Sequence, residues 1–129
     1  MQNAKLVEAI NDAIGAHGMW KLRLRTAIAQ GRCDITSTKA ACDDQCAFGQ
    51  WLYGSTIPHA VKSGVPYGVI RRLHAEFHQS AGSVLAYVES KDGARARQVM
   101  EGEFTARSEK LVRALGKWKG EVTAQTQAA

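Results

Sequence analysis

Apolar residues recur every three or four positions along most of the chain, which is the period of an amphipathic helix. The first such stretch runs from Ala4 to about Gln30 and predicts a helix of about seven turns. Asn3 is predicted as its N-cap, and Gly31 as the residue that follows its end. The apolar stripe of this helix comprises Leu6, Ile10, Ile14, Trp20, Leu24 and Ile28.

Two more stretches with the helical period follow. Pro66 suits a first helical turn, so the second long helix is predicted over Pro66–Ser90. The dipeptide Asp92-Gly93 predicts a tight turn, after which a third helix returns antiparallel over Ala94–Val122. The inward-facing residues are Ile70, Leu73, Phe77, Ala81, Val84, Leu85 and Val88 on the second long helix, and Val99, Phe104, Leu111, Leu115 and Trp118 on the third.

The region between the first two long helices is polar and rich in turn-forming residues, so residues 32–45 and 55–65 are predicted as connectors. A short apolar run separates them and predicts a helix that begins at Asp43 or Asp44 and ends near Gly54. No strand pattern with alternating hydrophobicity stands out. The predicted fold is all-α: an antiparallel four-helix-bundle-like domain with three long helices and one short helix.

Length and composition are those of one soluble globular domain. The chain has 129 residues, of which 45% are hydrophobic and 22% charged. We expect a single domain over residues 1–129, with its core over about 5–120 and a frayed tail at 123–129. No apolar run approaches the ~18 residues that span a bilayer, and the N-terminus lacks the apolar core of a signal peptide. We therefore expect a cytoplasmic protein that does not associate with membranes.

The net charge of +5 changes this expectation little. The basic residues are scattered rather than clustered, which favours solvated helix faces over a nucleic-acid surface. The three cysteines, Cys33, Cys42 and Cys46, form an odd set that argues against a disulfide scaffold and leaves thiols free to bind metals. Cys42 is either a spare ligand, a thiol that resolves an oxidised neighbour, or simply a small connector residue. Cys33 is assigned no role.

Four residues on predicted helices are candidate metal ligands. His74 and His78 are four positions apart, so both side chains leave one face of a helix. His17 lies on or beside the buried stripe of the first helix, where it is either a ligand or a buried histidine bonded to a carbonyl. Cys46 is predicted on the first turn of the short helix, where the field of the helix N-terminus would lower its thiol pKa. His59 lies in a connector and is interpreted as incidental.

Three imidazoles and one thiolate suit a tetrahedral zinc ion. Because four protein ligands would fill the coordination shell, the set favours a structural or sensory site over a catalytic one, which keeps a position open for water. The metalloprotease pattern His-Glu-x-x-His is absent, since Ala75 follows His74. The Glu-x-x-His pairs of di-iron bundles are absent too. We therefore predict that the chain is not an enzyme.

Three sequence blocks resemble a known family. They are His17-Gly18-Met19-Trp20-Lys21, Cys46-Ala47-Phe48-Gly49-Gln50-Trp51-Leu52 and His74-Ala75-Glu76-Phe77-His78. In this order and with these gaps they are similar to the motifs of the chemoreceptor zinc-binding (CZB) domain, over about residues 5–120. The resemblance implies a helical bundle that binds Zn²⁺ through His17, Cys46, His74 and His78. It also implies a homodimer that regulates a chemoreceptor or a diguanylate cyclase.

The favoured hypothesis is a zinc-binding sensory domain of bacterial signal transduction. It would respond to zinc, or to oxidants such as hypochlorous acid, and control a chemotaxis or cyclic-di-GMP output. Oxidation of Cys46 would weaken its bond to the metal, and the short helix over residues 43–54 is the element predicted to move. Two alternatives stay open: a structural zinc site in a protein-interaction bundle, and a small zinc enzyme.

Overall fold

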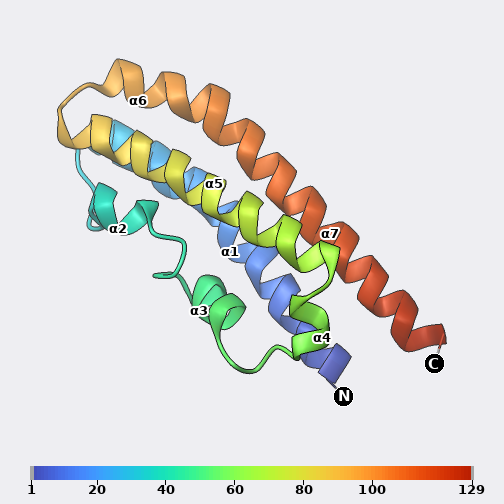
Figure 1. The fold of residues 1–129 in the computed structure, drawn as a ribbon. Coiled ribbons are helices and arrows are strands. Elements are labelled where there is room, and N and C mark those ends of the chain that lie inside the picture. Colours follow the sequence, from blue (N-terminus) through green and yellow to red (C-terminus); the bar gives the residue numbers. More distant parts are fainter. Residues whose placement is uncertain (1, 129) are drawn as a thin grey trace.

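Three long helical rods form the frame of the molecule. The computed structural model describes residues 2–128, and within them it is helical, without strands. The rods are α1 (Gln2–Gln30), α5 (Val65–Glu89) and a third composed of α6 (Gly93–Val99), η1 (Met100–Phe104) and α7 (Thr105–Ala128). Figure 1 shows α1 and α5 running in the same direction and the third rod running back alongside them.

A chain of three short helices makes the fourth, returning layer. These are α2 (Ser37–Ala41), α3 (Ala47–Tyr53) and α4 (His59–Lys62), and they lead from the end of α1 back to the start of α5 (Figure 1). The prediction of an all-α, four-helix-bundle-like domain is confirmed. The two predicted connectors were wrong in part, because each contains a short helix, α2 or α4.

Helix ends follow the local chemistry, with some departures from prediction. Gly31 follows α1 with φ of +72°, as expected of the residue after a helix end. Asn3 is not an N-cap, since α1 already includes it. The Thr36 side chain caps α2 by accepting from the Lys39 amide. The sequence did not single out this cap, because Thr36 lies among other polar residues. The Asp92 side chain caps α6 through the Arg95 amide at 3.2 Å.

The third rod differs from the single helix predicted for it. A π-helical segment, η1, separates α6 from α7. The hydroxyl of Thr105, the first residue of α7, donates to the Met100 carbonyl at the start of η1 at 2.7 Å. The rod also continues to Ala128, beyond the predicted end near Val122. The row of apolar residues that faces the core continues through η1, where Met100 and Phe104 are both buried.

The core runs the length of the bundle and contains few polar groups. The predicted inner residues of α5 are all buried, as are Phe104, Leu111, Leu115 and Trp118 of the third rod; Val99 is only partly buried. Among the described residues, the buried polar side chains are His17, His74, His78 and Ser80. Three of these four are the predicted histidine ligands. Within residues 2–128 no helix is both long and apolar enough to cross a membrane.

Candidate metal centre

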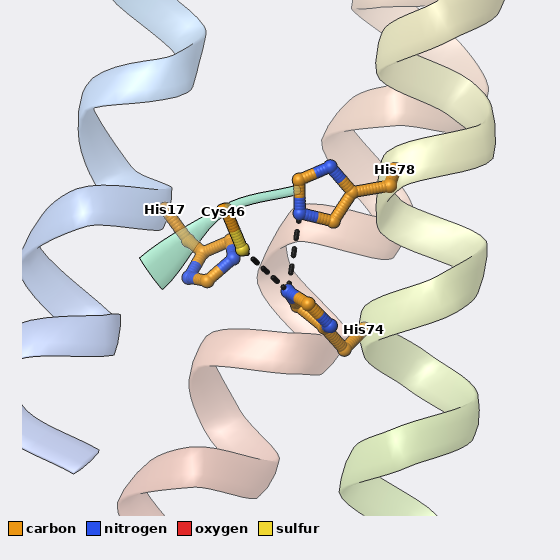
Figure 2. A group of neighbouring side chains, drawn as sticks. All are labelled: His17, Cys46, His74 and His78. Atoms are coloured by element: carbon orange, nitrogen blue, oxygen red, sulfur yellow. Dashed lines mark hydrogen bonds between the residues drawn. The ribbon is translucent and has the colours of Figure 1, made fainter. Parts of the chain in front are cut away.

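The four predicted ligands meet at one point in the middle of the bundle. His17 comes from α1, His74 and His78 from adjacent turns of α5, and Cys46 from the residue just before α3 (Figure 2). Their nearest nitrogen and sulfur atoms all lie within 4.8 Å of one another. The sequence placed these residues on separate helices, and the fold brings all four together.

His17 is held so that one nitrogen faces the cluster. Its Nδ1 lies 2.7 Å from the carbonyl oxygen of Ala13, one turn earlier on α1. Because a carbonyl only accepts, Nδ1 carries the proton and Nε2 keeps its lone pair. This Nε2 is buried and has no hydrogen-bond partner among the described residues. An unpaired buried acceptor is costly unless a ligand meets it.

His78 is oriented in the same way by a different element. Its Nδ1 donates to the Ala40 carbonyl of α2 at 2.9 Å, so its Nε2 is also the acceptor. Helix α2 can approach this closely because Gly82 has no side chain: a Cβ there would lie 2.6 Å from the Ala41 Cβ. At the far end of α2, Glu89 accepts from the Ser37 amide at 2.8 Å. Helices α2 and α5 are therefore in contact at both ends of α2, and the Ala40 carbonyl is held in place next to His78.

His74 lies between the remaining donors. Its Nε2 is 3.1 Å from the His78 Nε2 and 3.4 Å from the Cys46 Sγ (Figure 2). In a tetrahedral zinc site with bonds of about 2.0–2.3 Å, neighbouring donor atoms are roughly 3.3–3.6 Å apart. The 3.4 Å separation falls within that range, and the 3.1 Å separation is slightly shorter. The other ring nitrogen of His74, Nδ1, is buried and has no hydrogen-bond partner within the described part of the chain.

Cys46 is the N-cap of α3 rather than a residue of its first turn, because the helix begins at Ala47 and not at the predicted Asp43 or Asp44. Its Sγ accepts from the Gly49 amide at 3.3 Å. Gly49 permits this turn, since a Cβ at this position would lie 1.7 Å from the Asp43 carbonyl oxygen. The expectation of a lowered thiol pKa was wrong for the metal-free site. Burial raises the pKa of Cys46 and outweighs the amide contacts that lower it.

Burial also sets the charge state of the imidazoles. It lowers the pKa of His17 to about 4, although the bond to Ala13 opposes the shift. Burial lowers the pKa of His74 to about 2, with further contributions from the neighbouring His78 and His17. The pKa of His78 is lowered by burial as well. All three rings are therefore neutral at physiological pH, which is the form that binds metals.

Aromatic side chains close the site on several sides. The Phe48 ring of α3 meets His74 and His17 edge-on, with centroids 5.1 and 5.7 Å away. Phe77 packs against His17 at 4.9 Å, and Trp20 against His78 at 5.9 Å. This apolar surround excludes water and raises the cost of leaving the donor atoms without a partner.

The residues fit a zinc ion. The lone pairs of His17 and His78 converge on the cluster, the four donor atoms lie within 4.8 Å of one another, and three imidazoles with one thiol are donor types that zinc prefers. The remaining candidates lie outside the cluster of donor atoms. The Cys42 thiol contacts the Thr38 carbonyl at 3.3 Å, the Cys33 thiol lies beside Asp34, and His59 is on α4.

Sequence reasoning missed the groups that orient the ligands. A carbonyl partner for His17 was considered only as the alternative to metal binding, whereas the Ala13 carbonyl binds one ring nitrogen and leaves the other facing the cluster. The Ala40 carbonyl could not have been found from the sequence, since it depends on the unpredicted helix α2 and on its long-range contact with Gly82. The amide of Gly49 is visible only once Cys46 is known to be an N-cap.

Comparison with known proteins gave one match. The family model described as "Chemoreceptor zinc-binding domain" matches residues 17–85, just over half of the chain. The matched stretch begins at His17 and contains all four residues of the cluster. No curated protein and no solved structure matches the chain significantly.

Proposed function

The chain belongs to the chemoreceptor zinc-binding domain family, and on that premise we propose that His17, Cys46, His74 and His78 are its zinc ligands. Zinc is the cofactor that the family and the cluster of three histidines and one cysteine support. The observation that carries the assignment is the pair of imidazoles whose Nδ1 protons are engaged by carbonyls, so that both free nitrogens face one point. When bound, the ion would link α1, α5 and the start of α3.

We further propose that this centre is sensory. Cys46 is the one oxidisable donor of the four. Its thiolate would take the chlorine of hypochlorous acid with release of hydroxide. Water would then replace that chlorine to give a sulfenic acid, chloride and a proton. A sulfenic acid is a weaker metal ligand than a thiolate, so oxidation would loosen Cys46 from the other three donors. Loss of zinc itself would have the same local effect, and both inputs would act on one residue.

The packing of α3 supports a route from Cys46 to the rest of the bundle. Phe48 lies against the histidines, and it stacks on Trp51 with ring centroids 5.6 Å apart. Trp51 in turn contacts Trp118 of α7 at 6.4 Å. A displacement of α3 would therefore change the contacts of α7 as well as those of the metal centre. We propose that this contact path carries the signal.

The family resemblance is the basis for the signalling output and the oligomeric state that we propose. We propose that the whole chain acts as one homodimeric, cytoplasmic signalling domain. Its partner would be a chemoreceptor or a diguanylate cyclase, giving a chemotaxis or cyclic-di-GMP response. Sedimentation analysis with and without zinc tests the dimer. A monomer in both states would reject that part of the proposal.

A structural role is the second candidate, because three of the four donors are buried in the core of the bundle. Chelation separates the two. A structural centre would unfold the whole bundle when zinc is removed, whereas a sensory centre would loosen residues 43–54 and leave α1 and α5 protected. Amide hydrogen exchange measures this difference directly, with zinc, without zinc and after hypochlorite. Equal protection of residues 43–54 in all three states would reject the sensory role.

Metal analysis tests the ligand assignment. The purified protein is expected to carry one zinc per chain, and Cys46→Ser and His78→Ala are expected to bind it far more weakly. His59→Ala is the matched control, since His59 lies outside the cluster. Full occupancy in both ligand variants would remove the proposed site. Neither catalysis nor an open coordination position enters the proposal, because four protein donors fill a tetrahedral shell.

A further inference from the structure

Within the described structure, the connector of residues 43–45, which leads into Cys46, is joined to other segments by one exposed side-chain hydrogen bond. The Tyr53 hydroxyl, at the end of α3, donates to the Asp43 carboxylate, three residues before Cys46. Asp44 and Gln45, which follow Asp43, bond only to each other through their side chains within the described structure. The hydrogen bond between Tyr53 and Asp43 therefore closes residues 43–53 into a loop with Cys46 inside it.

The two ends of α3 are held very differently. Its C-terminal end is anchored by the Tyr67 hydroxyl, which donates to the Leu52 carbonyl at 2.7 Å, and by Lys62, which donates to Gly54 at 2.6 Å. Leu52 itself is fully buried. The N-terminal end of α3 is preceded by Cys46 and by the connector of residues 43–45. Tyr53 thus joins the firmly held end of the helix to the loosely held segment that carries the thiol.

The connector also lies directly against the helix that it precedes. Because Gly49 has no side chain, the Asp43 and Asp44 backbone rests against it. Gly49 donates its amide to the Cys46 Sγ from the same turn. Moving Asp43 away would therefore uncover the turn that positions the thiol 3.4 Å from His74.

We propose that Tyr53 is a positioning residue whose bond to Asp43, here called the Tyr53–Asp43 latch, sets how readily Cys46 leaves the metal centre. The inference rests on the proposed function, because it concerns the residue that would respond to oxidant. The latch is accessible, since Tyr53 is 42% exposed, and its loss leaves the buried core intact. Within the described structure neither Tyr53 nor Asp43 is hydrogen-bonded to a donor atom, so the latch would act on the rate at which Cys46 escapes. The Asp43 charge also works to raise the pKa of the Cys46 thiol, so Tyr53→Phe is the variant that removes the bond and keeps the charge.

The test compares Tyr53→Phe and Asp43→Ala with the control Tyr87→Phe. Tyr53→Phe keeps the ring and removes only the hydroxyl. Tyr87 is partly buried on α5, and its hydroxyl has no hydrogen-bond partner within the described structure. The first readout is the alkylation rate of Cys46 by iodoacetamide in the metal-free protein, followed by peptide mass spectrometry. Cys33 in the same molecule is the internal reference.

Both latch variants are expected to alkylate Cys46 about tenfold faster, which is the factor expected from losing one charge-assisted hydrogen bond. The double variant should be no faster than Asp43→Ala alone, because that change already removes both the bond and the Asp43 charge. In the zinc-loaded protein, transfer of zinc to excess chelator should accelerate by a similar factor. Amide exchange should quicken over residues 43–53 only.

Three results would overturn the latch: unchanged Cys46 alkylation, additive effects in the double variant, or faster exchange that extends to α1 and α5. The last would indicate general destabilisation. The alkylation arm needs no metal, so it reports on the latch even if the protein binds no zinc. Conversely, full zinc binding with unchanged alkylation in Tyr53→Phe would reject the latch and leave the proposed function standing.

Discussion

The proposed metal centre has two halves that are built differently. The histidine half comprises His17, His74 and His78, which lie on the two long helices α1 and α5 and are at most 1% exposed. The cysteine half is Cys46, which precedes the seven-residue helix α3 and is only partly buried. Two of the imidazoles are oriented by buried carbonyls, whereas the thiol depends on one amide and on a connector that follows the surface.

Because of this difference, the affinity for the metal and the response to a stimulus can depend on different residues. Donors on packed helices are preorganised, so they lose little conformational entropy when a metal binds. A donor on a short segment can move without disturbing the core, because local opening costs much less than global unfolding. A centre with both kinds of donor can hold a metal firmly and still react to a change at one residue. Acid and Gly82→Ala are expected to act on the histidine half, and Gly49→Ala on the cysteine half.

Acid is expected to have the largest effect, and it acts on the histidine half. The unfolded chain protonates its histidines near pH 6.5, whereas the native pKa of His17 is about 4 and that of His74 about 2. As pH falls from 6.5 to 4, the unfolded state takes up protons that the native state does not. The free energy of unfolding of the metal-free protein should therefore decrease by about 3 kcal/mol from His17 alone.

Urea denaturation at pH 7.5, 6 and 5 measures this loss. Asp34 and Glu89 also have a lowered pKa, from hydrogen bonds to Cys33 and to Ser37 respectively, but carboxylates titrate below this window. The decline above pH 5 can therefore be assigned to the imidazoles. A constant free energy of unfolding between pH 7.5 and 5 would contradict the neutral, buried state of all three histidines.

Gly49→Ala should damage the cysteine half and spare the histidine half. The new Cβ would lie 1.7 Å from the Asp43 carbonyl oxygen, so the connector must move. Overpacking of this severity costs about 3 kcal/mol. Gly116→Ala is the control, since a Cβ at Gly116 meets nothing within 4 Å and alanine favours a helix. Thermal unfolding and zinc titration should show lower stability and weaker binding in Gly49→Ala only.

The places of the three histidines in the fold were easier to predict from the sequence than that of Cys46, for a physical reason. His17, His74 and His78 lie on long helices whose apolar period fixes which side faces the core. The segment around Cys46 has no such period, and its conformation depends on close backbone approaches rather than on a repeating pattern. Gly82 against Ala41 and Asp43 against Gly49 are close approaches between segments, which no local pattern reveals. For the same reason the short helix was predicted to begin too early, and α2 was missed.

Gly82→Ala should weaken the histidine half with a smaller effect on stability. Its Cβ would lie 2.6 Å from the Ala41 Cβ and push α2 away from α5. The cost is about 2 kcal/mol, and the Ala40 carbonyl would withdraw from His78. Loss of such an orienting bond typically lowers metal affinity about tenfold or more. Gly68→Ala, on the same helix but with free space around it, serves as the control.

The two glycine variants distinguish the halves when Cys46 reactivity is also measured. In metal-free Gly82→Ala, the alkylation rate of Cys46 should stay at the wild-type value, because α3 keeps its contacts. In Gly49→Ala it should rise. Faster alkylation in both variants would mean that the two halves move as one unit, and that Cys46 is not held independently of the histidines.

The smallest effect is expected at the contact between α3 and α7. Trp51→Phe shortens the ring that reaches Trp118, 6.4 Å away, while an aromatic ring remains for Phe48 to stack against. Loss of one aromatic pair costs about 1 kcal/mol. Hydrogen exchange around Trp118 should respond to zinc removal in the wild type and respond less in Trp51→Phe. Trp118→Phe should reduce the response equally, and the two changes together should be non-additive. An undiminished response in both variants would show that the change at the metal centre reaches α7 through α5 instead. The histidines of α5 would then move on zinc removal, as Cys46 does.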